Sequence, residues 1–288
     1  MLKILIADNA GFCFGVKRAI DKALDSLSRG KCYLLGEIIH NKRVTQDLTA
    51  RGAVIVDGVD GLPPLEKGDT ATVIIRSHGA PKRDYAVLEE KGYAVVDATC
   101  PYVMKIHDIV RKHYEAGYHI VIVGGAAHPE VIATNGWCEN TATIIDETYD
   151  LSMLEKYEKL CFVCQTTFDG EKFKNIIKKT SEIRLKTVEI FDTICYTTYE
   201  RQREAAELAA SCDIVLVVGD KSSSNTNKLF DLCASVNRNT YFVNSLEMLE
   251  NTDFPPSGTV GIVAGASTPT ESIMEVKTYM GQEFGEAS

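Results

Sequence analysis

The sequence predicts an α/β fold made of three similar units with mostly parallel sheets. Short apolar runs alternate with amphipathic helical segments along all 288 residues. Near-continuous apolar runs bounded by glycine are typical of parallel strands covered by helices on both faces. A second observation is a pattern of strand, Asp, turn, Cys and helix that occurs three times. With 45% hydrophobic residues, the chain can bury a large core.

The apolar runs place the strands. We expect strands at 2–7, 73–75, 94–96, 120–123, 160–164, 214–218 and 260–263. A helix follows the first of them, because apolar residues from Val16 to Leu27 recur at helical spacing and Gly30 ends the pattern. Helical patterns follow most of the other strands.

The repeat sets the expected division of the chain. Its cysteines, Cys13, Cys100 and Cys195, lie 87 and 95 residues apart (100 − 13 and 195 − 100), and helices carrying Arg18, Lys105 and Arg201 follow them. This spacing predicts three α/β units of about 90 residues each. We expect them at 1–96, 97–192 and 193–288, with residues 1–13 able to pack with the third.

The three repeated cysteines are candidate metal ligands. Each is expected beside a helix N-terminus, whose dipole favours the thiolate. Ligands bind at the carboxyl ends of parallel strands, so the three sites can converge. Isolated, distant cysteines fit an iron–sulfur cube better than zinc, whose ligands usually come in close pairs. Three thiolates would leave one iron of a four-iron cube open. The alternative is three buried structural cysteines.

The other six cysteines are expected to be structural. Cys161 and Cys164 form a C-x-x-C pair, but they lie in an apolar run whose alternation puts them on opposite faces. The remaining four are expected in the core or near the surface, without partners: Cys32, Cys138, Cys212 and Cys233.

Polar loops after strands form a second candidate set. His40, His78 and His128 fall in similar loops, where a helix N-terminus and a histidine make a good anion site. Glu130 is a candidate proton donor, with His128 as an orienting partner. Capping and helix-dipole roles are the alternatives for these residues.

Three further turns between strand and helix are rich in hydroxyl and amide groups. They are 165–167, 219–228 and 265–269. None is a P-loop, and N-cap chemistry is the alternative, but together they predict a small phosphate-bearing ligand held by neutral donors and histidines.

Charge and hydropathy argue against a nucleic-acid-binding protein and against a membrane-spanning protein. The net charge of −9 argues against nucleic acid as a partner. The chain has no apolar run of 18 residues, so we expect no membrane span. The first eight residues are typical of a strand rather than an export signal, and nine cysteines fit reduced thiols in the cytoplasm.

These residues together carry a resemblance to a known family. The motifs are AGFCFGVKRAI, GEIIHN, RSHGAP, DATCPYV, GGAAHPE, QTT, DTICYTT with RQ, SSSNTNKL and AGAS. In order and spacing the whole chain resembles the 4-hydroxy-3-methylbut-2-enyl diphosphate reductases, oxidoreductases of the methylerythritol phosphate route to isoprenoids.

The resemblance implies a fold, a cofactor and a site. The three units would surround a central cavity with pseudo-threefold symmetry. Cys13, Cys100 and Cys195 would hold a [4Fe–4S] cluster with one iron open to the substrate hydroxyl. Diphosphate would bind to His40, His78, Ser223, Ser224, Asn225 and Ser267. His128 and Thr166 would line the cavity near the hydroxyl, and Glu130 would deliver protons.

The implied reaction is a reductive dehydration. Two electrons and two protons would remove the hydroxyl as water and give isopentenyl and dimethylallyl diphosphates. The electrons would come from an external ferredoxin or flavodoxin, and we expect a monomer. Glu200 departs from the family pattern and would oppose diphosphate if it pointed into the cavity.

Two alternatives belong to other classes. A cluster enzyme of the quinolinate synthase type would bind a dicarboxylate and needs arginine in these loops, where Arg76 is the main candidate. A non-enzymatic iron–sulfur sensor needs neither the diphosphate set nor Glu130.

Overall fold

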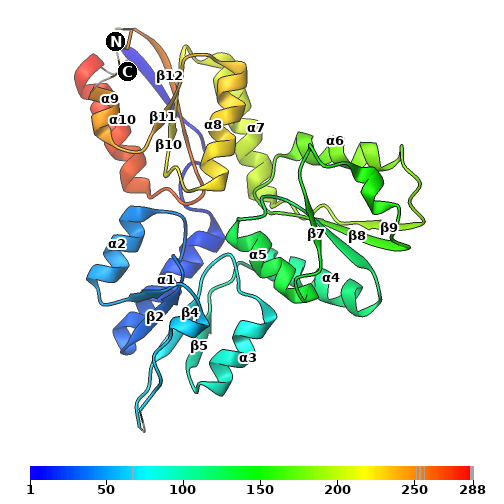
Figure 1. Cartoon of the computed structure of the whole chain (residues 1–288). Helices are drawn as coiled ribbons and strands as arrows, with labels where there is room; N and C mark the ends of the chain where they lie inside the picture. The colour runs from blue at the N-terminus through cyan, green and yellow to red at the C-terminus, as the bar shows by residue number, and fades with distance from the viewer. Residues whose placement is uncertain (67, 251, 253, 256, 286–288) are drawn as a thin grey trace. The chain divides into compact units, whose positions relative to one another are not determined.

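The described residues form three four-stranded sheets in which every strand pair is parallel (Figure 1). The structure is a computed structural model and describes residues 1–66, 68–250, 252, 254–255 and 257–285. The predicted α/β class and parallel sheets are confirmed.

The first sheet has the order β3-β2-β4-β5. Its strands are β2 (Cys32–Leu35), β3 (Val54–Val56), β4 (Thr72–Ile75) and β5 (Ala94–Asp97). The helices of this part of the chain are α1 (Phe14–Arg29), α2 (Lys42–Ala50), α3 (Lys82–Glu90) and the short 3-10 helix η1 (Val59–Gly61).

The second sheet repeats that order as β7-β6-β8-β9. Its strands are β6 (His119–Val123), β7 (Thr143–Ile145), β8 (Lys159–Cys164) and β9 (Thr187–Ile190). Its helices are α4 (Pro101–Glu115), α5 (Pro129–Asn135), α6 (Gly170–Thr180) and the 3-10 helices η2 (Gly136–Cys138) and η3 (Leu151–Leu154).

The third sheet has the order β11-β10-β12-β1, so the first strand of the chain completes it. Its strands are β1 (Leu2–Ile6), β10 (Ile214–Val218), β11 (Thr240–Val243) and β12 (Gly258–Ala264). Its helices are α7 (Tyr196–Ser211), α8 (Ser224–Val236), α9 (Leu246–Glu250) and α10 (Thr270–Phe284).

Alternate side chains of the third sheet enter two different cores. Leu216 and Ile262 pack with residues of α10, whereas Val217 and Val263 pack with residues of α7 and α8. Both faces of the sheet are therefore covered, which is why its strands are apolar without alternation.

The chain divides into two compact units. Unit 1 comprises residues 1–16, 40–42 and 196–288 and holds the third sheet, and unit 2 comprises residues 17–39 and 43–195 and holds the other two sheets. The expected boundaries at residues 96 and 192 stay a prediction. Among the described residues, no helix has the length and apolar character needed to cross a bilayer.

Candidate active site

Each repeated cysteine follows the edge strand that comes last in its sheet's order. Cys13 follows β1, Cys100 follows β5 and Cys195 follows β9, and a helix begins directly after each one. All three side chains are half-buried. Cys13 lies in unit 1 and the other two lie in unit 2.

Backbone hydrogen bonds fix each cysteine within its own unit. The Cys13 N–H donates to the Ala266 carbonyl at 3.1 Å. The Cys100 N–H donates to Ser77 at 2.9 Å, and the Cys195 N–H donates to Thr166 at 3.0 Å. These bonds tie the cysteine turns to loops that carry other predicted site residues. The convergence of all three thiols stays a prediction.

The other six cysteines are buried, as expected for structural positions. Burial raises the thiol pKa of Cys138 to about 11 and those of Cys161 and Cys233 to about 12. Cys161 shares a core cluster with Val163, two positions along β8, which fits the predicted alternation. Because a ligand must be a thiolate, these buried thiols are poor ligands.

The His78 loop rests on a buried aromatic layer. Gly79 has a φ of +80°, and a Cβ there would lie 2.5 Å from His107 Cε1. His107 stacks on Trp137 with ring centroids 5.1 Å apart, and Trp137 Nε1 donates to the Ala80 carbonyl at 3.0 Å. Burial lowers the His107 pKa to about 4, so the ring is neutral. No sequence pattern predicts a role for His107.

Substituting Gly79→Ala is expected to destabilise the protein by about 2 kcal/mol or more, because the new methyl group combines a strained φ with a clash. Thermal or denaturant unfolding measures the change. Gly92→Ala is the matched control: its φ is +76°, but no atom of the described residues lies within 4 Å of the added Cβ. Equal losses in the two variants would show that His107 does not constrain the loop.

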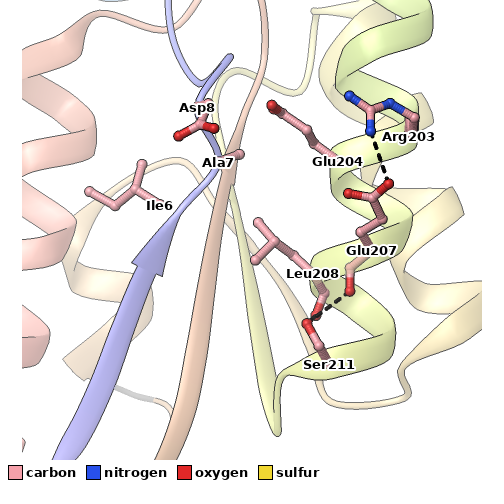
Figure 2. A pocket seen from close by; sticks show the side chains of 8 residues that line it. All are labelled: Ile6, Ala7, Asp8, Arg203, Glu204, Glu207, Leu208 and Ser211. Carbon is pink, nitrogen blue, oxygen red and sulfur yellow. Dashed lines mark hydrogen bonds and ion pairs between the residues drawn. The ribbon is translucent and has the colours of Figure 1, made fainter.

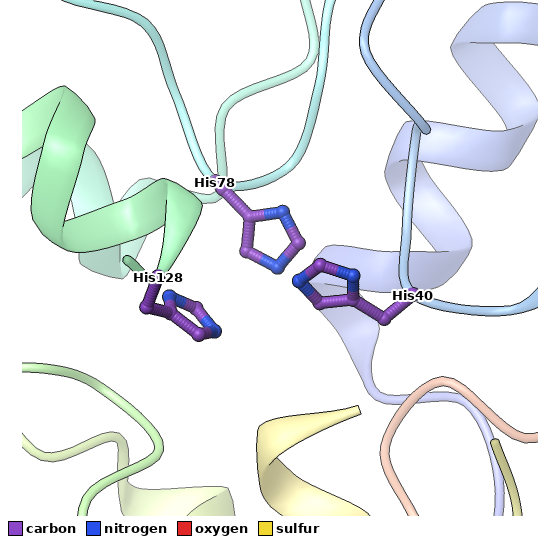
Figure 3. Close-up of side chains that lie close together, drawn as sticks. All are labelled: His40, His78 and His128. Atoms are coloured by element: carbon purple, nitrogen blue, oxygen red, sulfur yellow. The ribbon is translucent and has the colours of Figure 1, made fainter. Parts of the chain in front are cut away.

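His78 and His128 lie together in unit 2. Their rings make an edge contact, with centroids 5.4 Å apart and an interplanar angle of 90° (Figure 3). His128 caps α5, and its Nδ1 accepts the Glu130 N–H at 3.2 Å. A neutral His128 ring therefore carries its proton on Nε2. His40, also drawn in Figure 3, belongs to unit 1.

Glu130 is a buried carboxyl held by Thr166. Only 2% of Glu130 is exposed. The Thr166 N–H donates to Oε1 at 2.6 Å, and Thr166 Oγ1 donates to Oε2 at 2.5 Å. Burial raises the Glu130 pKa to about 7, and the two Thr166 hydrogen bonds oppose that rise. A carboxyl with a pKa near neutrality suits general acid catalysis.

Gln165 supports the same region; it belongs to the predicted 165–167 turn, but the sequence assigns it no individual role. Its Oε1 accepts the Gly125 N–H at 3.1 Å, and its Nε2 donates to Thr167 Oγ1 at 2.8 Å. A Cβ at Gly124 would lie 2.9 Å from Gln165 Cβ. The Gly124-Gly125 pair was the available signal, since it permits this close approach.

Unit 1 brings together the hydroxyl turns. Ser223 caps α8, and its Oγ accepts a 3.2 Å hydrogen bond from Ser267 Oγ. Ser224 is the first residue of α8 and is half-buried. Asn225 is 5% exposed, and its Nδ2 has no hydrogen-bond partner among the described residues. A buried amide donor in that state suits an acceptor such as a phosphate oxygen.

The His40 segment is anchored in the same unit by neighbours that the sequence did not single out. Asn41 Nδ2 donates to the Ser267 carbonyl at 2.9 Å, and the Lys42 N–H donates to Asp220 Oδ2 at 3.2 Å. His40, Ser223 and Ser267 therefore share one supporting network.

A separate polar cavity of about 400 Å³ lies in unit 1 between the end of β1 and α7 (Figure 2). It is lined by Ile6, Ala7, Asp8, Arg203, Glu204, Glu207, Leu208 and Ser211, none of them a predicted site residue. Glu200, the departure from the family pattern, forms an ion pair with Arg203 at 2.8 Å. Arg203 also pairs with Glu207, so its guanidinium offsets only part of the charge of these two carboxylates.

Comparisons with known proteins identify the family of the chain. The model of the LytB protein family matches residues 4–281. A 4-hydroxy-3-methylbut-2-enyl diphosphate reductase of Caldanaerobacter subterraneus subsp. tengcongensis is 42% identical over 297 residues, covering 99% of this chain and 100% of the relative. The Clostridioides difficile reductase of the same name is 40% identical over 283 residues, covering 97% and 99%.

Solved structures point the same way. A structure of (E)-4-hydroxy-3-methyl-but-2-enyl diphosphate reductase, described as the terminal enzyme of the non-mevalonate pathway, has a TM-score of 0.68 and 37% identity over 98% of this chain and 100% of that one. The Plasmodium falciparum reductase has a TM-score of 0.85 over 99% and 90%, and at 24% identity it supports the fold alone. The chain therefore belongs to the LytB family, that of the 4-hydroxy-3-methylbut-2-enyl diphosphate reductases, and is an oxidoreductase.

Proposed function

We propose that this chain reduces 4-hydroxy-3-methylbut-2-enyl diphosphate to isopentenyl and dimethylallyl diphosphates with two electrons and two protons. The observation that carries the proposal is Glu130, a buried carboxyl with a pKa near 7 held by Thr166 and linked to His128. Removing a hydroxyl as water needs a proton donor that is still protonated at neutral pH.

The donor set fits a [4Fe–4S] cluster. Three half-buried cysteines stand at helix starts, whereas the six core cysteines do not. Cys13, Cys100 and Cys195 would hold the cluster. When bound, the cluster supplies the electrons and an open iron site for the substrate hydroxyl.

The diphosphate would be bound mainly by neutral donors. Ser223, Ser224, Asn225 and the first turn of α8 offer hydroxyl, amide and backbone N–H groups, and Ser267 adds a further hydroxyl. His40 and His78 would complete the set. The helix N-terminus favours an anion without a fixed positive side chain.

Glu130 and Thr166 would move the proton. A protonated Glu130 can donate from Oε2 to Thr166 Oγ1, which frees the Thr166 hydroxyl proton for the substrate oxygen. His128 would orient Glu130 through the backbone hydrogen bond at the start of α5. Because the carboxyl is buried, bulk water does not compete for this proton.

The remaining parts of the proposal concern partners and organisation. We propose an external ferredoxin or flavodoxin as electron donor, a monomeric enzyme in the cytoplasm, and three α/β units around one cluster cavity. Unit boundaries near residues 96 and 192 would leave one cysteine turn at or near each junction.

The test is the stoichiometry of the reaction. Anaerobically reconstituted protein is supplied with a measured amount of a reduced one-electron dye and the allylic diphosphate. We expect about two dye molecules oxidised per product molecule, and both diphosphate isomers in the product. Dye oxidation without either isomer would overturn the proposed reaction.

Asn225→Asp is expected to raise KM about tenfold or more, because it places a carboxylate where a diphosphate oxygen needs a donor. Steady-state kinetics at several substrate concentrations measure the effect. Asn227→Asp, an exposed change two positions along α8, is the matched control. An unchanged KM in Asn225→Asp, with the protein folded, would remove Asn225 from the binding set.

A further inference from the structure

Two arginines hold the backbone of cysteine turns. In unit 1, Arg201 of α7 is 5% exposed. Its Nη2 donates to the Gly11 carbonyl at 2.7 Å and its Nη1 donates to the Ala264 carbonyl at 3.2 Å. Gly11 lies two residues before Cys13. One buried guanidinium therefore links the Cys13 turn to the end of β12.

The same arrangement occurs in unit 2. Arg18 of α1 is half-buried, and its Nη1 donates to the Thr99 carbonyl at 2.9 Å. Lys22, one turn later on α1, donates through Nζ to the Asp97 carbonyl at 2.6 Å. Two cations of α1 thus hold the carbonyls of the turn that leads to Cys100.

The sequence positions give this arrangement a pattern. Arg18 is five residues after Cys13, and Arg201 is six residues after Cys195. In both cases, a helix that begins at one repeated cysteine supplies the cation that holds the turn before another. The helix after Cys100 departs from the pattern, because Lys105 is exposed on α4.

A buried cation at this place has two physical effects. Charge-assisted hydrogen bonds to two carbonyls fix the loop, since leaving those carbonyls unpaired costs free energy. A fixed positive charge near a thiolate also favours the more negative, reduced state of any metal centre that the thiolate binds.

We propose that Arg201 is a positioning residue that orders the Cys13 turn and raises the reduction potential of the metal centre bound there, and that Arg18 does the same for the Cys100 turn. The claim that these arginines order the cysteine turns depends on the structure alone (the ordering half). The claim that they raise the reduction potential rests on the proposed function (the electrochemical half).

The ordering is tested on protein without metal by amide hydrogen exchange. Arg201→Met is expected to speed exchange about tenfold or more at residues 11–13, including the Cys13 N–H that donates to Ala266. Arg203→Met is the matched control, since Arg203 is an exposed residue of the same helix. Unchanged exchange at 11–13, or equal acceleration throughout unit 1, would overturn the positioning role.

If Arg201→Met does not fold, Arg18→Met tests the same claim at residues 99–100, with the exposed Arg29→Met on α1 as its control. Local acceleration at those amides alone supports the proposal. Acceleration equal to that in Arg29→Met overturns it.

The electrochemical half is tested by potentiometric titration of reconstituted protein. Arg201→Met is expected to have a more negative midpoint potential than the parent, and Arg201→Lys is expected to recover it, because lysine keeps the charge. A potential unchanged in Arg201→Met would overturn this half. Parent protein that binds no iron and sulfide would overturn the proposed function, while the exchange result would still decide the ordering.

Discussion

Replacing Glu130 with Gln is expected to lower turnover about 100-fold or more while iron and sulfide content stays at the parent level. Gln keeps the size of the side chain and can still accept the Thr166 N–H, but its amide has no acidic proton to transfer. Turnover is measured anaerobically on protein with matched iron content.

Glu171→Gln is the matched control for this substitution. Glu171 is the second residue of α6, as Glu130 is of α5, but its side chain is 80% exposed and pairs with Lys174. The control should keep full activity. Parent activity in Glu130→Gln would exclude Glu130 as the proton donor.

The Glu130 pKa also predicts a pH profile. A pKa raised to about 7 means that the carboxyl holds its proton below that pH and loses it above. Activity that needs the proton should therefore fall as the pH rises through about 7. In Glu130→Gln, this alkaline limb should be absent from the residual activity. A limb retained in the variant would assign it to another group.

Removing any one of the three half-buried cysteines is expected to abolish turnover and most of the bound iron and sulfide. Cys13→Ala, Cys100→Ala and Cys195→Ala each delete one proposed ligand, and two thiolates hold a four-iron cube poorly. Iron and sulfide assays and the visible absorption of the cluster measure the loss.

Cys233→Ala serves as the control for the cysteine series. Cys233 is fully buried, and its Sγ donates to the Ala205 carbonyl, so the change should lower the melting temperature slightly and leave the metal content intact. Loss of iron in Cys233→Ala but not in Cys195→Ala would reverse the ligand assignment.

Most of the central strands were predictable from the sequence, and so were the edge strands β1 and β5. The runs at 120–123, 214–218 and 260–263 are buried on both faces, so they are continuous and apolar. The predicted runs left out the central strand β2 and the edge strands β3, β7 and β11, all of which have only three or four residues. The residues of these three edge strands are partly exposed, so composition gives little signal there.

The site shows a similar division. Cys13, Glu130 and Ser223 could be selected because a residue type capable of chemistry follows a strand. The hydrogen bonds between Glu130 and Thr166, and between Arg201 and Gly11, join residues 36 and 190 positions apart. Such pairs depend on tertiary packing, which local sequence does not encode. For the same reason the contacts of Gln165 with Gly125 and of Asn41 with Ser267 could not be predicted.

The most direct test is substrate-dependent oxidation of a reduced viologen dye by the anaerobically reconstituted protein. Adding 4-hydroxy-3-methylbut-2-enyl diphosphate should start dye oxidation in the parent and not in Cys13→Ala. The opposite result is no dye oxidation when this substrate is added to protein fully loaded with iron and sulfide. That result would contradict the proposed reductase function, and the dicarboxylate enzyme and the iron–sulfur sensor would remain as the alternative functions to test.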